Sequence, residues 1–328
     1  MEACATAHHW ARGLSGLGHS VKLMPPTYVK PYVKRSKNDA ADAEAICEAV
    51  NRPTMRFVPV KSKVQQAVIM LHKTRDLLTR QKTMLINALR SHCAEYGIIV
   101  PKGVQNVRKL VEKLSAHEET ALPELARTTV QLLIEQVDIL EDKRQKLEDE
   151  LAVWHRNDET SQRVATVPGV GLITATAIAT NITDASHFKS GRQFAAFLGL
   201  VPRQFSTGGK ERLGRISKQG YQYLRRLLIV GATSMLRHFR DKPGKEADWM
   251  RQLLKRRSPR IVSVALANKM VRIVWAVMAQ ETVYRTEMSP YMNGAIRLRL
   301  MLRMKGKIAL CVFHKFENFL KGVPCTTP

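Results

Sequence analysis

Asp39 and Asp42 belong to a short segment whose residue types and spacing could support chemistry on phosphate esters. Two alanines separate them, which puts both carboxylates on one face of a helix. Such carboxylates repel each other unless a cation lies between them, and Mg²⁺ takes oxygen ligands of this kind. Two-metal nucleases use such groups to hold the attacking and leaving oxygens of a phosphodiester. The alternative is structural, because the helix dipole favours Asp at a helix start.

The segment from Pro202 to Gly220, which we expect to be a Gly-rich, basic loop, also has the composition of a reactive site. Ser206 and Thr207 precede two glycines there. A serine hydroxyl attacks phosphorus when it is exposed and when nearby cations stabilise the developing negative charge. We expect the surrounding cations to bind DNA phosphates, and they are Arg203, Lys210, Arg212, Arg215 and Lys218. The alternative is a flexible basic loop that only clamps phosphates. A P-loop is excluded because its Gly-x-x-x-x-Gly-Lys-Ser/Thr signature is absent.

Two further segments have features of nucleic-acid contacts. Lys34, Arg35 and Lys37 come just before Asp39 and could bring a phosphate backbone to the carboxylates. Pro168-Gly169-Val170-Gly171 lies between two expected helices and is typical of a helix-hairpin-helix turn. There Gly169 and Gly171 would let the backbone approach a phosphate at a helix N-terminus. An ordinary helix–helix turn explains the same residues equally well.

The composition independently favours a nucleic-acid partner. The chain has 328 residues with 53 Lys and Arg against 28 Asp and Glu, a formal net charge of +25. A charge this large needs a polyanion to neutralise it. Ribosomal and architectural proteins share the charge, and a membrane-surface protein is the weaker alternative. No run of about 18 apolar residues occurs, so we expect no membrane span.

The cysteines indicate a reducing compartment. The five cysteines form no Cys-x-x-Cys pair and are irregularly spaced, so we expect free thiols. The first residues lack the charged start and apolar stretch of a signal peptide. These features predict a cytoplasmic protein.

The elements expected around Asp39 and Asp42 form a small α/β unit. Residues 2–18 are predicted to form a helix that Glu2 opens, and residues 20–24 alternate and end at two prolines, which favours a strand. Residues 39–50 are predicted to form an Ala-rich helix. One helix–strand–helix unit is too little for a sheet domain. It has the character of the back half of an α/β domain whose first strands are missing.

Two long helices are expected next, over residues 62–96 and 124–156. In the first, Leu71, Leu78 and Leu85 recur every seven residues. In the second, apolar steps of three and four residues are interrupted only at Arg144, which is typical of a coiled-coil seam. We expect an antiparallel helical hairpin that offers a dimer interface.

The remaining chain is expected to be mostly helical. Helices are predicted over residues 221–239 and 261–280, with the basic linker 255–260 between them. Residues 286–328 mix Met, Arg and Leu without periodicity. We interpret this end as a short basic helix or a disordered extension.

The order of four segments resembles the DEDD insertion-sequence transposases over about residues 1 to 285. The segments are MEACATAHHWARGL, KRSKNDAADAEAI, VPGVGLITATAIA and FAAFLGLVPRQFSTGGKERLGRISKQGYQYLRRLL. The resemblance implies an α/β plus mostly α chain. It divides into a truncated RuvC-like (RNase H-like) nuclease-fold domain at 1–58, a coiled-coil helical hairpin at 59–160, a serine-bearing transposase domain at 161–285 and an atypical basic extension at 286–328.

The resemblance also implies site residues and partners. Glu2, Asp39 and Asp42 would supply three of the family's four acidic metal ligands, and Mg²⁺ would be the cofactor. The family serine would be Ser206, although an ungapped match could place Thr207 there. A structured guide RNA would bridge donor and target DNA. The composite site would join the RuvC-like domain of one subunit to the serine domain of another, in a dimer or tetramer.

The chain departs from the family pattern at both ends. The first Asp of the quartet would lie upstream of Glu2, and the basic extension is foreign to the family. We therefore expect a truncated copy that binds metal poorly and recombines DNA weakly or not at all. The leading interpretation is a transposase with a phosphoserine intermediate. The alternatives are a non-catalytic nucleic-acid-binding relic and a junction nuclease that uses the carboxylates alone.

Overall fold

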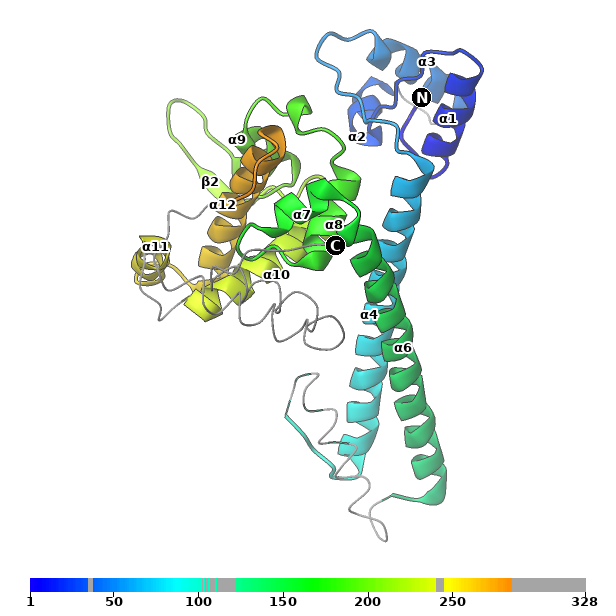
Figure 1. Ribbon diagram of the computed structural model, residues 1–328, viewed down its shortest axis with the longest axis vertical. Helices are drawn as coiled ribbons and strands as arrows, with labels where there is room; N and C mark the ends of the chain where they lie inside the picture. The colour runs from blue at the N-terminus through cyan, green and yellow to red at the C-terminus, as the bar shows by residue number, and fades with distance from the viewer. Residues whose placement is uncertain are drawn as a thin grey trace, which may run out of the picture.

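A computed structural model describes residues 1–34, 38–101, 103, 106, 110, 122–239 and 245–284 of the chain. These residues form a small N-terminal unit, a long helical hairpin and a C-terminal bundle of helices (Figure 1). Most of them are helical, and a two-stranded sheet accompanies the bundle. At this level the expected mixture of α/β and helical structure is confirmed.

The N-terminal unit contains α1 (Ala7–Gly16), α2 (Pro26–Val29), the 3₁₀ helix η1 (Lys30–Tyr32) and α3 (Asp39–Val50). Extended backbone connects them: Glu2 bridges Met24 in parallel, and Leu23 bridges Val58 antiparallel. The prediction that Glu2 opens a helix is therefore wrong. Its backbone is held beside Met24 instead, because the Ala3 N–H donates to the Met24 carbonyl at 2.7 Å.

Leu23 and Met24 give this unit two small cores. Neighbouring residues of an extended segment point to opposite faces. Leu23 packs with Ala7 and Ala11 of α1, whereas Met24 packs with Ala45 and Ala49 of α3. All six side chains are buried. Helices therefore cover both faces of the strand-like segment, and α3 begins at the residue expected from the sequence.

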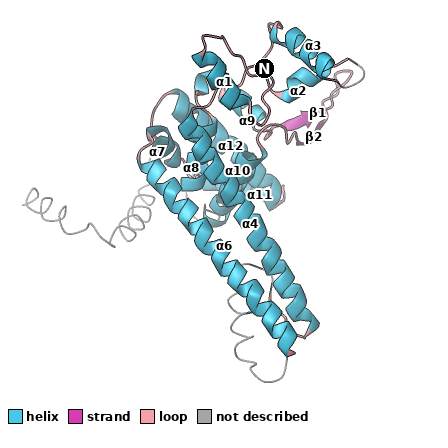
Figure 2. Ribbon diagram, turned by 90° about the vertical axis from the view of Figure 1, so that its right-hand side faces the viewer, coloured by secondary structure: helices cyan, strands magenta, loops and turns pink. Residues whose placement is uncertain are grey.

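The long hairpin consists of α4 (Lys63–Glu95) and α6 (Glu124–Arg156), close to the predicted bounds. Ser62 begins α4 with a capping box, which satisfies two backbone N–H groups at the helix start. The two helices lie side by side in both ribbon views (Figures 1 and 2). Arg75 pairs with Glu148, and Lys82 with Glu141. These pairings run in opposite directions along the chain, so the helices are antiparallel.

Arg144, the polar interruption of the apolar pattern, has a structural explanation. It binds Glu141 and Glu148 on its own helix, and the same two carboxylates accept from the other helix. Its side chain is only 20% exposed. An arginine between two carboxylates satisfies charges that are taken partly out of water. The interruption is therefore an ion-pair network that joins the two helices.

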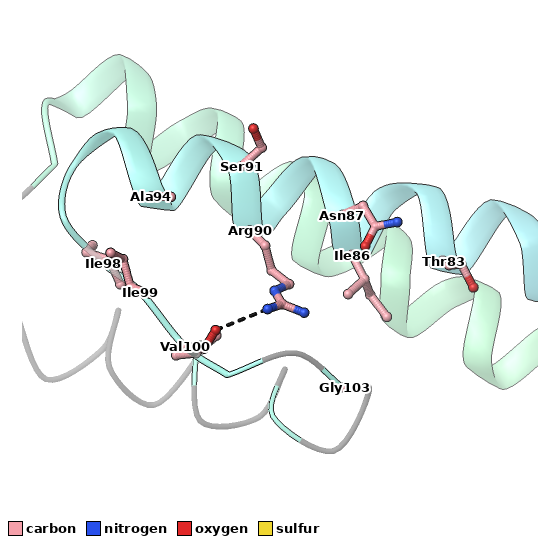
Figure 3. A pocket seen from close by; sticks show the side chains of 10 residues that line it. All are labelled: Thr83, Ile86, Asn87, Arg90, Ser91, Ala94, Ile98, Ile99, Val100 and Gly103. Carbon is pink, nitrogen blue, oxygen red and sulfur yellow. Dashed lines mark hydrogen bonds between the residues drawn. The ribbon is translucent and has the colours of Figure 1, made fainter. Parts of the chain in front are cut away.

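The far end of the hairpin has its own small core, formed by Leu89, Cys93, Val100 and Val130 among others. Arg90 donates to the Val100 carbonyl at 3.1 Å and holds the chain beyond α4 against the helix (Figure 3). A hollow of about 520 Å³ lies beside this contact. Figure 3 shows that its lining comes from α4 and from the segment that follows it.

The C-terminal bundle holds the largest core of the described chain. Its elements are α7 (Glu159–Ala165), α8 (Leu172–Asn181), η3 (Ala185–His187), α9 (Gly191–Phe197), α10 (Gln222–Phe239), α11 (Lys245–Leu254) and α12 (Pro259–Ala279). Among the described residues, α12 alone is long and apolar enough to cross a membrane. It packs instead against α9 and α10, and buries Leu266, Met270 and Val274 in this core. The sequence did not predict α11.

The segment expected to be a loop between α9 and α10 is a β-hairpin. Its strands are β1 (Pro202–Gln204) and β2 (Leu213–Ile216), which pair antiparallel. Three or four residues with mostly exposed side chains leave no alternating apolar pattern to detect in the sequence. The predicted extension 286–328 lies outside the described residues.

Candidate active site

Ser206 lies two residues beyond β1, near the tip of the exposed hairpin. Pro202 is opposite Ile216, and Gln204 is opposite Leu213, with an irregular register between these pairs. The side chains of β1 and of the residues around Ser206 are exposed. A hydroxyl in this place can reach a large substrate without any rearrangement of the core.

Two N–H groups fix the Ser206 hydroxyl oxygen. The Gln204 side-chain amide donates to Ser206 Oγ at 3.0 Å, and the Arg212 backbone N–H approaches it at 3.3 Å. Donors aimed at an oxygen stabilise negative charge as it develops there. Because Oγ accepts both bonds, its own proton is available to a base. The local geometry therefore suits a nucleophile.

Thr207 occupies a different position in the same turn. Its carbonyl accepts from the Lys210 N–H at 3.0 Å, and Gly208 and Gly209 lie between them with positive φ. Within the described structure the Thr207 hydroxyl has no hydrogen-bond partner. The turn thus gives Ser206 the two donors and leaves Thr207 at the apex.

The base of the hairpin is tightly joined to the bundle. A Cβ on Gly220 would lie 1.9 Å from the Phe197 carbonyl oxygen, and one on Gly199 would lie 2.3 Å from the Gln219 carbonyl oxygen. Both glycines also have positive φ, a conformation that other residues adopt only with strain. The two chain segments therefore approach more closely than any side chain would permit.

Five cations predicted to bind DNA lie on this hairpin or at its base. Arg203 donates to the Ser217 carbonyl at 3.1 Å and so turns towards the base. The other four are exposed and have no ion pair or side-chain hydrogen bond within the described chain, and they are Lys210, Arg212, Arg215 and Lys218. Glu211 is the one carboxylate among them. The hairpin is thus a positively charged arm, and its DNA contacts stay a prediction.

Asp39 and Asp42 lie in the first turn of α3. Asn38 caps this helix, because its side-chain oxygen accepts from the Ala41 N–H at 2.7 Å. Asp39 is exposed and Asp42 is half-buried. Within the described residues neither carboxylate has a hydrogen bond or an ion pair. Since Asn38 does the capping, both carboxylates are left as oxygen ligands of the kind that suits Mg²⁺ together with substrate phosphates.

The three predicted metal ligands do not converge in the described structure. No group of three or more His, Cys, Asp or Glu side chains there is close enough to hold a metal ion. Glu2 is half-buried beside Met24, apart from the cluster that its pairing with Asp39 and Asp42 would require. In Figure 1 the unit that carries α3 also lies away from the β-hairpin. The structure therefore brings Asp39 and Asp42 together, and joins neither Glu2 nor Ser206 to them.

Gly169 has a packing role that its sequence context did not reveal. A Cβ there would lie 2.7 Å from the Met270 methyl carbon, and a Cβ on Gly231 would lie 2.1 Å from the Gly169 carbonyl oxygen. The turn between α7 and α8 thus rests directly on α10 and α12. Gly171 is exposed at the N-terminus of α8. Contacts of Gly169 and Gly171 with a phosphate stay a prediction.

Lys34 is exposed and pairs with Glu44 of α3 at 2.6 Å. An exposed pair of this kind contributes little to stability, so Lys34 can exchange its partner for a phosphate. Arg35 and Lys37, the other basic residues predicted here, lie outside the described residues.

Sequence reasoning missed three residues that shape the serine hairpin. Gln204 donates to Ser206, the Phe205 ring lies against Gly214 of β2, and Arg225 of α10 binds the base of the hairpin. Alternation along β1 could have placed Gln204 and Ser206 on one face, but only once a strand was expected there.

Two segments of the chain match known protein families. Residues 161–248 match the family model described as Transposase IS116/IS110/IS902 family, and residues 1–98 match the DEDD transposase model of IS110, described as Transposase. The chain is 48% identical over 286 residues to the "Probable family 20 transposase" of Pseudomonas aeruginosa, covering 87% of this chain and 85% of that protein.

Two named insertion-sequence transposases are also similar. The transposase for insertion sequence element IS1328 of Yersinia enterocolitica is 42% identical over 284 residues, which cover 87% of this chain and 84% of that protein. The transposase for IS1111A of Coxiella burnetii is 40% identical over 285 residues, which cover 87% and 78%. The chain therefore belongs to the IS116/IS110/IS902 family of transposases, enzymes that act on DNA.

Proposed function

We propose that this transposase breaks and rejoins DNA through a covalent bond between Ser206 and a DNA phosphate. The observation that carries the proposal is the geometry of Ser206 Oγ, which is exposed and held by two N–H donors. In the step, Ser206 Oγ forms a bond to phosphorus, and the bond from phosphorus to one deoxyribose oxygen breaks. The hydroxyl proton leaves to a base, and the departing oxygen gains a proton. Attack of that oxygen on the phosphoserine reverses the step and rejoins DNA.

The cations of the hairpin would stabilise this reaction. Arg212 and Lys210 lie on the same short turn as Ser206. Phosphoryl transfer depends on positive groups around the charged oxygens of phosphorus. Arginine suits this role because its guanidinium binds two phosphate oxygens at once.

Mg²⁺ is the proposed cofactor, held by Asp39 and Asp42, and Glu2 would have to move from its place beside Met24 to become a further ligand. A bound Mg²⁺ would neutralise charge on the scissile phosphate. The two carboxylates of α3 have no other partner in the described structure, and DNA phosphates can complete the coordination of a cation held by two protein ligands. Lys34, with Arg35 and Lys37, would guide the DNA backbone to this place.

The proposed site is composite, with the carboxylates from one subunit and Ser206 from another. The separation of α3 from the β-hairpin within one chain supports this arrangement (Figure 1). It requires at least a dimer, and the long hairpin offers an interface for one.

Exposed apolar residues recur every seven residues along both helices of the hairpin. On α4 these are Met70, Leu77 and Met84, and on α6 they are Leu125, Leu132, Ile139 and Val153, with one step skipped. Each is at least 42% exposed. A heptad spacing of apolar residues is the pattern that packs against another helix in a coiled coil.

Each apolar stripe lies on the outer side of its own helix, away from the contact between the two helices. Leu77 follows the interhelix residue Arg75 by two positions, and Ile139 follows Val137 by two. Two positions along an α-helix correspond to a rotation of about 200°, so these side chains point away from the partner helix.

We infer that the stripe on α6 binds the same stripe of a second copy, which gives the coiled-coil contact. Leu132→Glu is expected to lower the mass measured by light scattering. Gln131→Glu is the control and should leave the mass unchanged, because its exposed side chain lies about 100° around the helix from Leu132. Equal masses of the two variants would contradict the interface.

The domain division proposed for the chain follows the described contacts. Residues 1–3 pair in parallel with residues 22–24, α1 connects the two segments, and α3 packs on the other face. This arrangement supports a RuvC-like unit at residues 1–58. The ion-paired α4 and α6 support a coiled-coil unit at 59–160. The bundle with its helix-hairpin-helix-like turn supports a serine-bearing unit at 161–285. The separate extension at 286–328 lies outside the described residues and stays a prediction.

A structured guide RNA is proposed as a second nucleic-acid partner. The net charge of +25 supports this partner, because a strongly basic chain binds the phosphates of polyanions in addition to those of the DNA at the serine hairpin. Specificity that resides in base pairing needs no base-reading residues in the protein, so the protein contributes mainly backbone contacts.

Trapping a covalent adduct tests the proposed reaction. The full chain would be incubated with DNA that carries the ends of its own element, with Mg²⁺, and with RNA transcribed from that element. Denaturing gels and mass spectrometry are expected to show DNA attached to Ser206, and Ser206→Ala is expected to abolish it. An adduct at Thr207 would move the nucleophile by one residue. DNA cleavage that survives Ser206→Ala and requires Asp42 would overturn the proposal in favour of a carboxylate nuclease.

A further inference from the structure

The first turn of α10 contacts three other parts of the molecule within six residues. Tyr221 and Tyr223 bind side chains of α8 and α4, Arg225 binds the base of the serine hairpin, and Arg226 binds α4. No feature of the proposed chemistry requires these contacts. Their directions show what the turn holds together.

Tyr223 is joined to the long hairpin through the buried His72. The Tyr223 hydroxyl lies 3.1 Å from His72 Nδ1, and His72 Nε2 lies 3.2 Å from the Thr176 hydroxyl. Thr176 donates its proton to a carbonyl of its own helix, so it accepts from His72 Nε2–H. His72 Nδ1 is then left to accept from Tyr223. The three side chains therefore form one directed chain of hydrogen bonds across α8, α4 and α10.

Burial keeps this chain in one protonation state. It lowers the pKa of His72 to about 4, with a further contribution from Arg75. Burial also raises the pKa of Tyr223. A neutral imidazole and a protonated phenol are the forms that the hydrogen bonds require.

Two further contacts hold the same turn. Arg226 forms an ion pair with Asp76, one helical turn along α4 from His72, and its guanidinium lies over the Tyr223 ring. The Tyr221 hydroxyl bonds to Asn181, which accepts from Lys61 at 3.1 Å. Lys61 in turn bonds through its backbone to His8 and Arg12 of α1.

Arg225 extends from this turn to the base of the serine hairpin. Its Nη1 donates to the Leu198 carbonyl at 3.1 Å and to the Gln219 carbonyl at 2.7 Å. These carbonyls lie just before Gly199 and Gly220, where the two segments meet. Arg225 is 8% exposed. One buried nitrogen therefore joins the two ends of the segment that carries Ser206.

We propose that the first turn of α10 is the positioning element that fixes the Ser206 hairpin relative to the long helical hairpin, with Arg225 and Tyr223 as its positioning residues. If the long hairpin dimerises as proposed, its orientation determines where Ser206 meets the carboxylates of another subunit. The proposal rests on the proposed function for its consequence in catalysis, but the clamp itself can be measured without activity.

Hydrogen exchange on the full-length protein tests the Arg225 contact directly. The Ser217 and Lys218 amides donate to Val201 and Gly199 at the hairpin base. Arg225→Met is expected to accelerate exchange of these amides at least about tenfold, because the local opening that exposes them becomes easier. Arg225→Lys restores one donor and is expected to recover part of the protection. Arg237→Met, an exposed arginine of the same helix, is the matched control and should change neither amide.

Adduct formation at Ser206 tests the consequence. Arg225→Met is expected to slow it by about tenfold or more while DNA binding in a gel-shift assay is unchanged, with partial rescue by Arg225→Lys. Tyr223→Phe removes only the hydroxyl that meets His72 and is expected to slow adduct formation without altering hairpin protection. Unaltered exchange in Arg225→Met would overturn the clamp, whatever the nucleophile. Faster exchange in Arg225→Met, with unaltered adduct formation in both variants, would overturn the positioning role. Faster exchange in Arg225→Met together with no adduct in the wild-type protein would leave the clamp intact and refute the proposed function.

Discussion

The serine hairpin and the start of α3 carry the two halves of the proposed chemistry, and they are built in opposite ways. Ser206 Oγ is held by two N–H donors, on a hairpin whose base is fixed by glycine contacts and by Arg225. Asp39 and Asp42 have no partner within the described residues, because Asn38 does the capping. A neutral hydroxyl can be positioned by the protein alone. Two like charges need a cation before their arrangement becomes favourable.

The largest expected effect comes from the start of α3, where Asp39 and Asp42 have no partner within the described residues. Asp39→Asn with Asp42→Asn removes the proposed metal ligands and is expected to lower adduct formation by on the order of 10³-fold. The free energy of unfolding should change by less than about 1 kcal/mol, because the loss of the favourable interaction with the helix dipole is offset by the loss of like-charge repulsion. Cleavage rates at varied Mg²⁺ and thermal unfolding measure the two quantities.

Glu44→Gln is the matched control, because it changes an exposed carboxylate of the same helix that pairs with Lys34. It should leave the Mg²⁺ dependence intact. A double variant with full activity would show that α3 is only a helix start, and a large loss of stability would show that the carboxylates do have structural partners.

The second prediction concerns the serine hairpin, whose base is fixed by close contacts between two chain segments. Gly220→Ala is expected to destabilise the protein by about 3 kcal/mol or more, because the new Cβ overlaps the Phe197 carbonyl oxygen at positive φ. Gly208→Ala has a comparable φ but meets no atom within 4 Å, so its cost is limited to about 1 kcal/mol of backbone strain. Chemical denaturation of both variants measures the difference. Equal losses would mean that the close approach at the hairpin base does not exist in solution.

The third prediction is a pH dependence of stability that arises at His72 of α4, which contacts Tyr223 of α10 and Thr176 of α8. His72 has a pKa of about 4 when folded and 6.5 when unfolded. Between these values the unfolded chain binds more protons, so stability falls as the pH is lowered from 6.5 to 4, by about 3 kcal/mol in total. His72→Gln keeps a donor and an acceptor and should flatten this part of the profile. Identical pH profiles of unfolding in the two proteins would contradict the buried neutral imidazole.

Local signals explain what could be predicted from the sequence. The bounds of α4 and α6 follow from heptad periodicity and from Ser62, and α3 follows from Asn38 and its alanines. Each depends on residues within a few turns. Arg144 interrupts the pattern because it binds the same two carboxylates, Glu141 and Glu148, that Arg75 and Lys82 bind from the other helix. No local pattern predicts that pairing.

Non-local pairings explain what was missed. Glu2 is held by Met24, and Arg225 meets carbonyls that are 27 and 6 residues away. The sequence identified Ser206 and its cations by composition alone. It did not distinguish a loop from a hairpin, because β1 and β2 pair through backbone groups while their side chains face solvent. The role of Gln204 depends entirely on that pairing.

The smallest predicted effect distinguishes Ser206 from the neighbouring Thr207 as the nucleophile of the serine hairpin. Gln204→Leu removes one of the two donors to Ser206 Oγ and is expected to slow adduct formation about tenfold. This factor corresponds to about 1.4 kcal/mol, the contribution of one hydrogen bond that strengthens as the oxygen becomes negative. Gln204→Glu replaces the donor by an acceptor with negative charge and should slow the reaction more, most strongly above the pKa of the new carboxyl. If Thr207 were the nucleophile, both variants would react at nearly the wild-type rate, since Gln204 forms no hydrogen bond with the Thr207 hydroxyl in the described structure. Single-turnover adduct formation as a function of pH therefore identifies which hydroxyl the hairpin holds for reaction.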